Sequence, residues 1–171
     1  MVDGASNIHW KENVLEQASE LEYVGFWARV GATLIDTILL CILTLPLLVG
    51  VYGVAYFGNE AFIAGPADFL ISYVLPAVIV VLLWARMSTT PGKMAIGATI
   101  VDARTGGKPT TRQFVIRYLG YYVSVLPLLL GYIWVGFDAR KQGWHDKMAG
   151  TVVVRRKGGA AEPVRFEQPG R

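Results

Sequence analysis

The sequence predicts an all-α membrane protein with three apolar helical segments and a small cytoplasmic element of two β-strands. Its composition is 53% hydrophobic and 17% charged, whereas a soluble domain carries about a quarter charged residues. Apolar runs occupy residues 30–56, 69–85 and 118–137. Two further stretches, 95–103 and 150–156, are rich in β-branched residues and are typical of short strands.

The three apolar runs are long enough to enter a lipid bilayer. A helix needs about 20 apolar residues to cross the hydrocarbon core, within a range of roughly 17–25. Asp36 is the only charged residue of the first run, and the other two contain none. Aromatic residues such as Tyr23, Trp84 and Trp134 flank the runs, as expected at the headgroup level. The bilayer is therefore the first predicted partner.

The distribution of basic residues predicts an orientation. Residues 57–68 contain no Lys or Arg, whereas residues 86–117 contain several. Basic loops stay on the cytoplasmic side, so the first connection is expected outside and the N-terminus inside. The two β-stretches need each other as partners and hence should lie on one side of the membrane.

The third apolar run allows two arrangements. A single crossing would place the basic residues after Phe137 outside, against the charge bias. Pro127 lies near the middle of the run and Gly131 follows it, and proline kinks or breaks a helix. We favour a re-entrant hairpin of two short helices over a single kinked crossing.

Arg29 and Asp36 are the charges that stand out in the first helix. They lie about 10 Å apart along the helix axis, too far to pair, so each is expected to have a partner elsewhere. A carboxylate at membrane depth costs at least about 2.5–3.5 kcal/mol unless it is paired, hydrated or protonated. Asp36 is thus either an ion-binding group or a hydrogen-bonding tie between helices, and Arg29 either a site residue or an interfacial arginine.

Three blocks of sequence, taken together, resemble the RDD family of bacterial membrane proteins, named for an arginine and two aspartates. They are YVGFWARVGATLIDTILL, STTPGKMAIGATIVDARTGGKPTT and FDARKQGWHDKMAGTVVV. The resemblance covers residues 23–156 and implies a helical membrane domain in the bacterial cytoplasmic membrane, with a role in transport. Residues 1–22 are then a polar cytoplasmic segment, and residues 157–171 a disordered basic tail.

The resemblance also implies site residues. Arg29 and Asp36 correspond to the family's arginine and first aspartate, while Asp138 and Asp146 both remain candidates for the second. Asp146 could also cap a short helix. Neighbouring His145 is either a proton carrier or a solvated turn residue.

Two functions remain open. The first is transport of an unidentified ligand, with cation or proton coupling as one form and Asp36 in an ion site; it requires a homo-oligomer or a partner protein. The second is a membrane assembly module that stabilises a partner through a basic cytoplasmic face, which could also bind anionic lipid.

Other classes of function find no support in the sequence. An enzyme is not expected, because metalloprotease and nucleotide-binding motifs and a convincing nucleophile–base pair are missing. We expect no metal and no cofactor. Nucleic acid is an unsuitable partner, because the basic residues flank the apolar runs.

Overall fold

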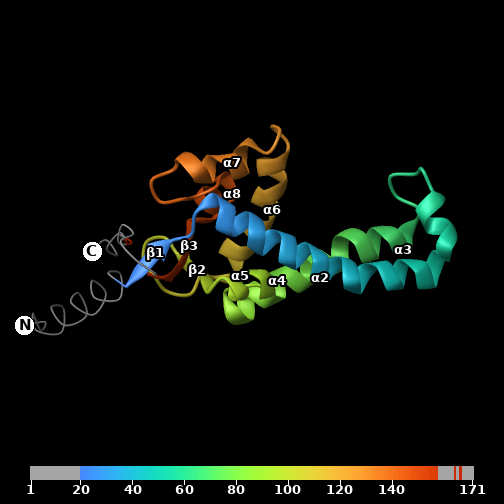
Figure 1. Ribbon diagram of the computed structural model, residues 1–171, viewed down its shortest axis with the longest axis horizontal. Coiled ribbons are helices and arrows are strands. Elements are labelled where there is room, and N and C mark those ends of the chain that lie inside the picture. The colour runs from blue at the N-terminus through green and yellow to red at the C-terminus, as the bar shows by residue number, and fades with distance from the viewer. Residues whose placement is uncertain (1–19, 158–163, 165, 167–171) are drawn as a thin grey trace, which may run out of the picture.

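The computed structural model describes residues 20–157, 164 and 166, and it is mostly helical. A long helical arm projects from a compact end that contains a small sheet and several shorter helices (Figure 1). Most of the predicted N-terminal segment 1–22 and tail 157–171 lies outside the described residues. Two described residues of that tail, Val164 and Phe166, pack against the sheet.

Two helical segments form the arm. The first is α2 (Phe26–Tyr52), and the second runs through α3 (Pro66–Phe69), the π-helical turn η2 (Leu70–Val74) and α4 (Leu75–Met87). Each is long and apolar enough to cross a membrane. Only 6% and 11% of their most apolar windows are buried inside the protein, so most of their apolar surface is left for lipid.

The far end of the arm is closed by a short connection. The 3-10 helix η1 (Val54–Gly58) follows α2. The buried Asp68 then accepts hydrogen bonds from the Tyr56 hydroxyl at 3.0 Å, the Ser72 hydroxyl at 2.7 Å and the Ala64 amide at 2.8 Å. These bonds satisfy the carboxylate within the loop, which gives it a structural role at this end of the arm.

The third apolar run is broken where the proline predicts. Helices α6 (Thr111–Val125) and α7 (Leu130–Phe137) meet at 101°. Leu128 and Leu129 adopt left-handed backbone conformations in the turn between them. The leucines of this turn are exposed, as expected for a tip surrounded by lipid.

The sheet contains three strands instead of the two predicted. The order is β1 (Leu21–Tyr23), β3 (Thr151–Arg156), β2 (Ala98–Asp102), and both pairings are antiparallel. The added strand pairs Glu22 with Arg155, whose side chains form an ion pair at 2.5 Å. A three-residue strand carries too little pattern to be recognised without its partner.

Strand pairing also fixes the end of the molecule at which the α6–α7 pair begins and ends. The strand β2 precedes α6 and β3 follows α7, and the two strands are hydrogen-bonded neighbours. The α6–α7 pair therefore starts and finishes at the sheet, as the favoured re-entrant arrangement requires; that arrangement in the membrane stays a prediction. We refer to this end of the molecule as the sheet side.

Two short helices complete the sheet side. The helix α5 (Pro91–Ala95) follows α4, and α8 (Trp144–Ala149) precedes β3. A methyl group on Gly120 of α6 would lie 2.8 Å from the His145 Cα atom. The glycine therefore allows α8 to approach α6 closely.

Candidate functional site

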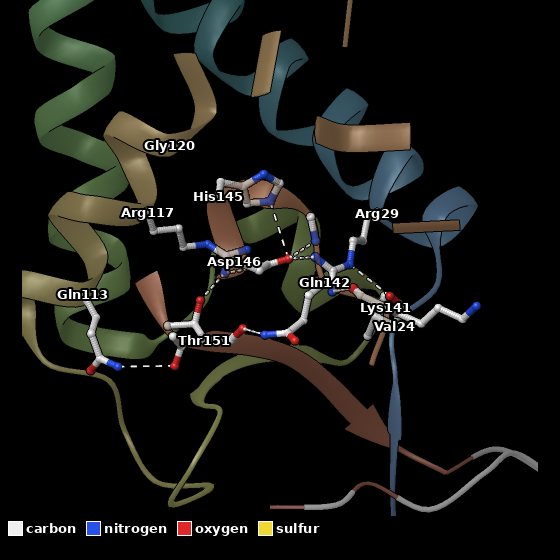
Figure 2. A network of polar contacts seen from close by, with 12 residues as sticks. Val24, Arg29, Gln113, Arg117, Gly120, Lys141, Gln142, His145, Asp146 and Thr151 are labelled. Carbon is white, nitrogen blue, oxygen red and sulfur yellow. Dashed lines mark hydrogen bonds and ion pairs between the residues drawn. The ribbon is translucent and has the colours of Figure 1, made fainter. Parts of the chain in front are cut away.

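The buried carboxylate of Asp146 is the centre of a polar cluster at the sheet side (Figure 2). It lies in the first turn of α8, where its Oδ2 atom accepts a hydrogen bond from the Gly143 amide at 3.0 Å. This is the helix-capping role that the sequence allowed for it. Asp146 also contacts two guanidinium groups from different helices.

Arg29 reaches this carboxylate from the first turn of α2. Its Nη1 atom lies 2.5 Å from Asp146 Oδ2, and its Nε and Nη2 atoms donate to the carbonyls of Val24 and Lys141. One arginine thus ties the start of α2 to the loop before α8. The structure thereby gives Arg29 the partner outside its own helix that the sequence required.

Arg117 of α6 is the second arginine of the cluster. Its Nη1 atom pairs with Asp146 Oδ1 and also donates to the Thr151 hydroxyl at 2.7 Å. Its guanidinium carbon lies 5.5 Å from the centre of the Trp84 ring and 5.9 Å from that of Tyr121. The side chain is only 1% exposed, so it is held in a sandwich of aromatic rings and a carboxylate.

The two arginines keep Asp146 ionised. Burial disfavours the charged carboxylate, but the charges of Arg117 and Arg29 outweigh that effect and hold its pKa well below the usual value. The cluster accordingly combines two positive groups with one negative group, a surplus of one positive charge.

His145 lies beside the cluster and is held neutral. Its Nε2 atom is 3.5 Å from Asp146 Oδ2, and its Nδ1 atom is 3.2 Å from the Ser124 hydroxyl oxygen. Burial is the main reason that its pKa is lowered to about 3, and the nearby arginines act in the same direction. A proton carrier at neutral pH would have to overcome this environment, so that role stays a prediction.

The contacts of Ser124, His145 and Asp146 superficially resemble a serine-hydrolase triad, but the chemistry does not fit. Ser124 is fully buried, and its hydroxyl donates to the Gly120 carbonyl at 2.8 Å. A histidine with a pKa near 3 is a poor base at neutral pH. The arrangement is that of packed polar side chains between α6 and α8.

Asp36 belongs to a separate group of contacts. It accepts hydrogen bonds from the Thr90 hydroxyl at 2.5 Å and from the Gly92 amide at 2.7 Å, and Lys93 Nζ lies 3.7 Å from its Oδ2 atom. A methyl group on Gly92 would come within 2.0 Å of the Ala32 carbonyl oxygen. The aspartate thus anchors the start of α5 closely against α2.

Asp138 lies apart from both groups of contacts. Its Oδ1 atom pairs with Lys147 at 2.5 Å, and its Oδ2 atom accepts from the amides of Arg140 and Gln142. Hydrogen bonds and the lysine charge outweigh partial burial and lower its pKa. Of the two candidate aspartates, Asp146 is the one that contacts Arg29.

A cavity of about 370 Å³ adjoins the buried cluster. It lies between the first turns of α2 and the α6–α7 pair, and the residues that line it are mainly apolar. Its lining also includes the charged residues Arg29, Lys93 and Arg117, together with His145 and the hydroxyl-bearing residues Thr33, Tyr121 and Tyr132. Within the described part of the chain, no grouping of three or more His, Cys, Asp and Glu side chains offers a metal site.

Comparison with known proteins assigns this arrangement to a family. The RDD family profile matches residues 23–150, which include α2, the α6–α7 pair and the cluster around Asp146. This chain belongs to the RDD family. It is a membrane protein of a family without an assigned function.

Two curated relatives of this RDD protein are themselves described as uncharacterised. The uncharacterised membrane protein YteJ of Bacillus subtilis (strain 168) is 31% identical over 141 residues, covering 79% of this chain and 82% of the relative. The uncharacterised protein RP437 of Rickettsia prowazekii (strain Madrid E) is 38% identical over 72 residues. That match covers 42% of this chain, which spans only 39% of the length of RP437. No solved structure matches the chain.

Sequence reasoning missed two residues of the site of this RDD protein. Arg117 and Lys93 both lie in the basic stretch 86–117, which was used only to predict the orientation. A signal for Arg117 exists in the sequence, since it directly precedes the apolar run that begins at Tyr118. Its burial could not be read there, because it arises from the packing of α6 against α8 and against Trp84 of α4.

Proposed function

We propose that this RDD protein takes part in transport, with the cavity between α2 and the α6–α7 pair as its ligand site. The observation that carries the proposal is the cavity itself, which lies beside a cluster of buried charges and is bounded by a broken helix. Broken helices and buried ionisable groups are common features of substrate sites in membrane transporters.

The proposal includes an orientation and an assembly. The sheet side faces the cytoplasm of a bacterial cell and the 54–65 connection faces outward, because the basic residues gather at the sheet side. Two long helices and a re-entrant pair cannot enclose a path alone. The exposed apolar faces of α2 and α4 would therefore contact a second copy or a partner protein as well as lipid.

Ion coupling is the finer form of the proposal. Asp36 is the one acidic residue of α2, and it pairs with Lys93. A cation at Asp36 would have to displace the lysine ammonium group, whereas protonation of Asp36 would release it. The proposal assigns no enzymatic reaction to the chain, because Ser124 and His145 do not form an active nucleophile.

The test is proton movement in proteoliposomes with an enclosed pH dye, driven by sodium, potassium or lithium gradients. We expect flux from the wild type, loss of flux in a folded Asp36→Asn variant and retained flux in the matched Asp102→Asn variant. Asp102 is the last residue of β2 and does not line the cavity.

Absence of flux from well-folded wild type with all three cations would refute the coupled form. Failure of Asp36→Asn to fold would identify the aspartate as a structural tie. The second function, assembly with a partner, would then be examined by identifying membrane proteins that co-purify with the chain.

A further inference from the structure

We propose that the cavity binds an amphiphile whose head carries one negative charge, a carboxylate or a phosphodiester, with its apolar tail between α2 and α7. The inference rests on the proposed ligand site and names the chemical class of its ligand. It is carried by the lining of the cavity and by the charge balance of the cluster.

The cavity lining divides into an apolar wall and a basic floor. Its wall is formed by apolar residues of α2, α6 and α7 and of the turn between the last two, among them Val30, Leu34, Val125, Leu129 and Ile133. Its floor contains Arg29, Lys93 and Arg117, and none of the described carboxylates lines the cavity. An apolar wall with a few convergent polar groups is the usual composition of a small-molecule site.

Among the described residues, carboxylates balance only part of the positive charge of the floor. Lys93 is neutralised by Asp36, whereas Arg29 and Arg117 share the single carboxylate of Asp146. An unpaired charge is strongly disfavoured in a buried environment. An anionic head at the floor would supply the missing negative charge, and a cation would face three positive groups.

Arg117 contributes its charge to the floor from a fixed position. Its guanidinium is held over the Trp84 and Tyr121 rings, and its side chain is only 1% exposed. Because the guanidinium is held in place, its positive charge stays beside the cavity, where it attracts an oxyanion.

Size and position fit an amphiphile that comes from the membrane. The volume of about 370 Å³ lies near the lower end of the range of about 300–1,000 Å³ for small-molecule pockets. This volume is enough for the polar head of the amphiphile and the adjoining part of one acyl chain. The remainder of the acyl chain would extend along the α6–α7 pair, whose exposed leucines are expected to face lipid.

Binding can be measured by native mass spectrometry of the full chain in dodecyl maltoside, a neutral detergent. The probes are palmitate, phosphatidylglycerol and phosphatidylcholine. We expect one equivalent of palmitate, phosphatidylglycerol or both to bind, and phosphatidylcholine to bind at least about tenfold more weakly. Comparison of palmitate with phosphatidylglycerol distinguishes a carboxylate head from a phosphodiester head.

Three variants locate the site. Arg29→Gln removes the surplus charge and should weaken anion binding about tenfold or more. Thr33→Phe fills the cavity at an exposed position and should weaken it without any change of charge. Arg86→Gln removes an exposed basic residue that does not line the cavity, and should leave binding unchanged.

Equal binding of phosphatidylcholine, or equal losses in Arg29→Gln and Arg86→Gln, would overturn the inference. If Arg29→Gln does not fold, unaltered binding by Thr33→Phe would overturn it equally well. Specific anion binding without ion flux in proteoliposomes would refute coupled transport and leave this inference standing. Flux without specific binding would refute this inference and leave coupled transport standing.

Discussion

Replacement of Asp146 by asparagine should destabilise the protein more than any other single carboxylate-to-amide change at the sheet side. The substitution preserves the size of the side chain and an acceptor for the Gly143 amide. It removes the counter-charge of Arg117, which is 1% exposed, and of Arg29, which is 12% exposed. The expected effect therefore comes mainly from an arginine left buried without a partner charge.

The magnitude follows from that burial. Removal of one partner from a buried ion pair costs about 3–5 kcal/mol, because the remaining charge is neither hydrated nor compensated. In a chain of this size 1 kcal/mol corresponds to roughly 2–4 °C in melting temperature, so the drop should be roughly 6–20 °C. Arg29 contributes the smaller part, since it still donates to two backbone carbonyls.

The assay is the melting temperature of purified protein in a neutral detergent, with Asp138→Asn as the matched control. Asp138 pairs with Lys147, whose side chain is 45% exposed, and such a pair contributes about 0–1 kcal/mol. A second variant, Asp146→Asn combined with Arg117→Met, should be more stable than Asp146→Asn alone, because it removes the uncompensated charge.

Equal melting temperatures for Asp146→Asn and Asp138→Asn would refute the reasoning, since they would show that burial does not set the cost. A double variant less stable than the single one would also contradict it. The packing contribution of Arg117 against the aromatic rings would then exceed that of its charge.

Three further predictions concern packing, pH and topology. Gly131→Ala should destabilise the folded protein by about 1–3 kcal/mol, because its methyl group would lie 2.6 Å from a backbone atom of α6. The control is Gly136→Ala, whose methyl group would have no atom within 4 Å. This control should be neutral or slightly stabilising. The pKa of His145 is about 3 in the folded state and about 6.5 in the unfolded state. Its contribution to the free energy of unfolding is therefore fully present above pH 6.5 and decreases as the pH falls, by roughly 2 kcal/mol at pH 5. His145→Gln should reduce that loss. In cysteine-labelling experiments on a background without the native cysteine, Asn59→Cys should react with an impermeant maleimide from outside the cell, and Arg104→Cys only after lysis.

Each of these predictions has an outcome that contradicts it. Similar unfolding midpoints for the two alanine variants would show that α6 and α7 are not in close contact. An unchanged pH profile in His145→Gln would show that another group titrates between pH 5 and 6.5. Labelling of Arg104→Cys in intact cells would place the sheet side outside.

The sequence was sufficient for the parts of the fold that depend on local pattern. Both long helices follow from apolar runs of membrane-spanning length, and the break between α6 and α7 falls at Pro127 as predicted. The strands β2 and β3 were recognisable by their β-branched residues. Hydropathy, proline and β-propensity act over a few neighbouring residues, so they can be read from one chain.

The site was predicted only in its components. Arg29 and Asp36 were singled out because charges in or next to an apolar run are uncommon, and Asp138, Asp146 and His145 because they lie in the block that resembles the end of the family pattern. The partners of these residues were not predicted. Arg29 meets a carboxylate 117 residues away, and Asp36 meets a helix start 56 residues away. Nothing in the local sequence of either residue specifies such a contact.

The sequence by itself therefore determined that the chain enters a membrane, where its helices break and which charges require partners. Only the tertiary structure decided that two arginines share one aspartate, that the first strand joins the sheet and that a cavity adjoins the surplus charge. The physical reason is that the burial of a charge and the group that neutralises it are properties of packing between distant segments. Hydropathy, in contrast, belongs to each segment alone.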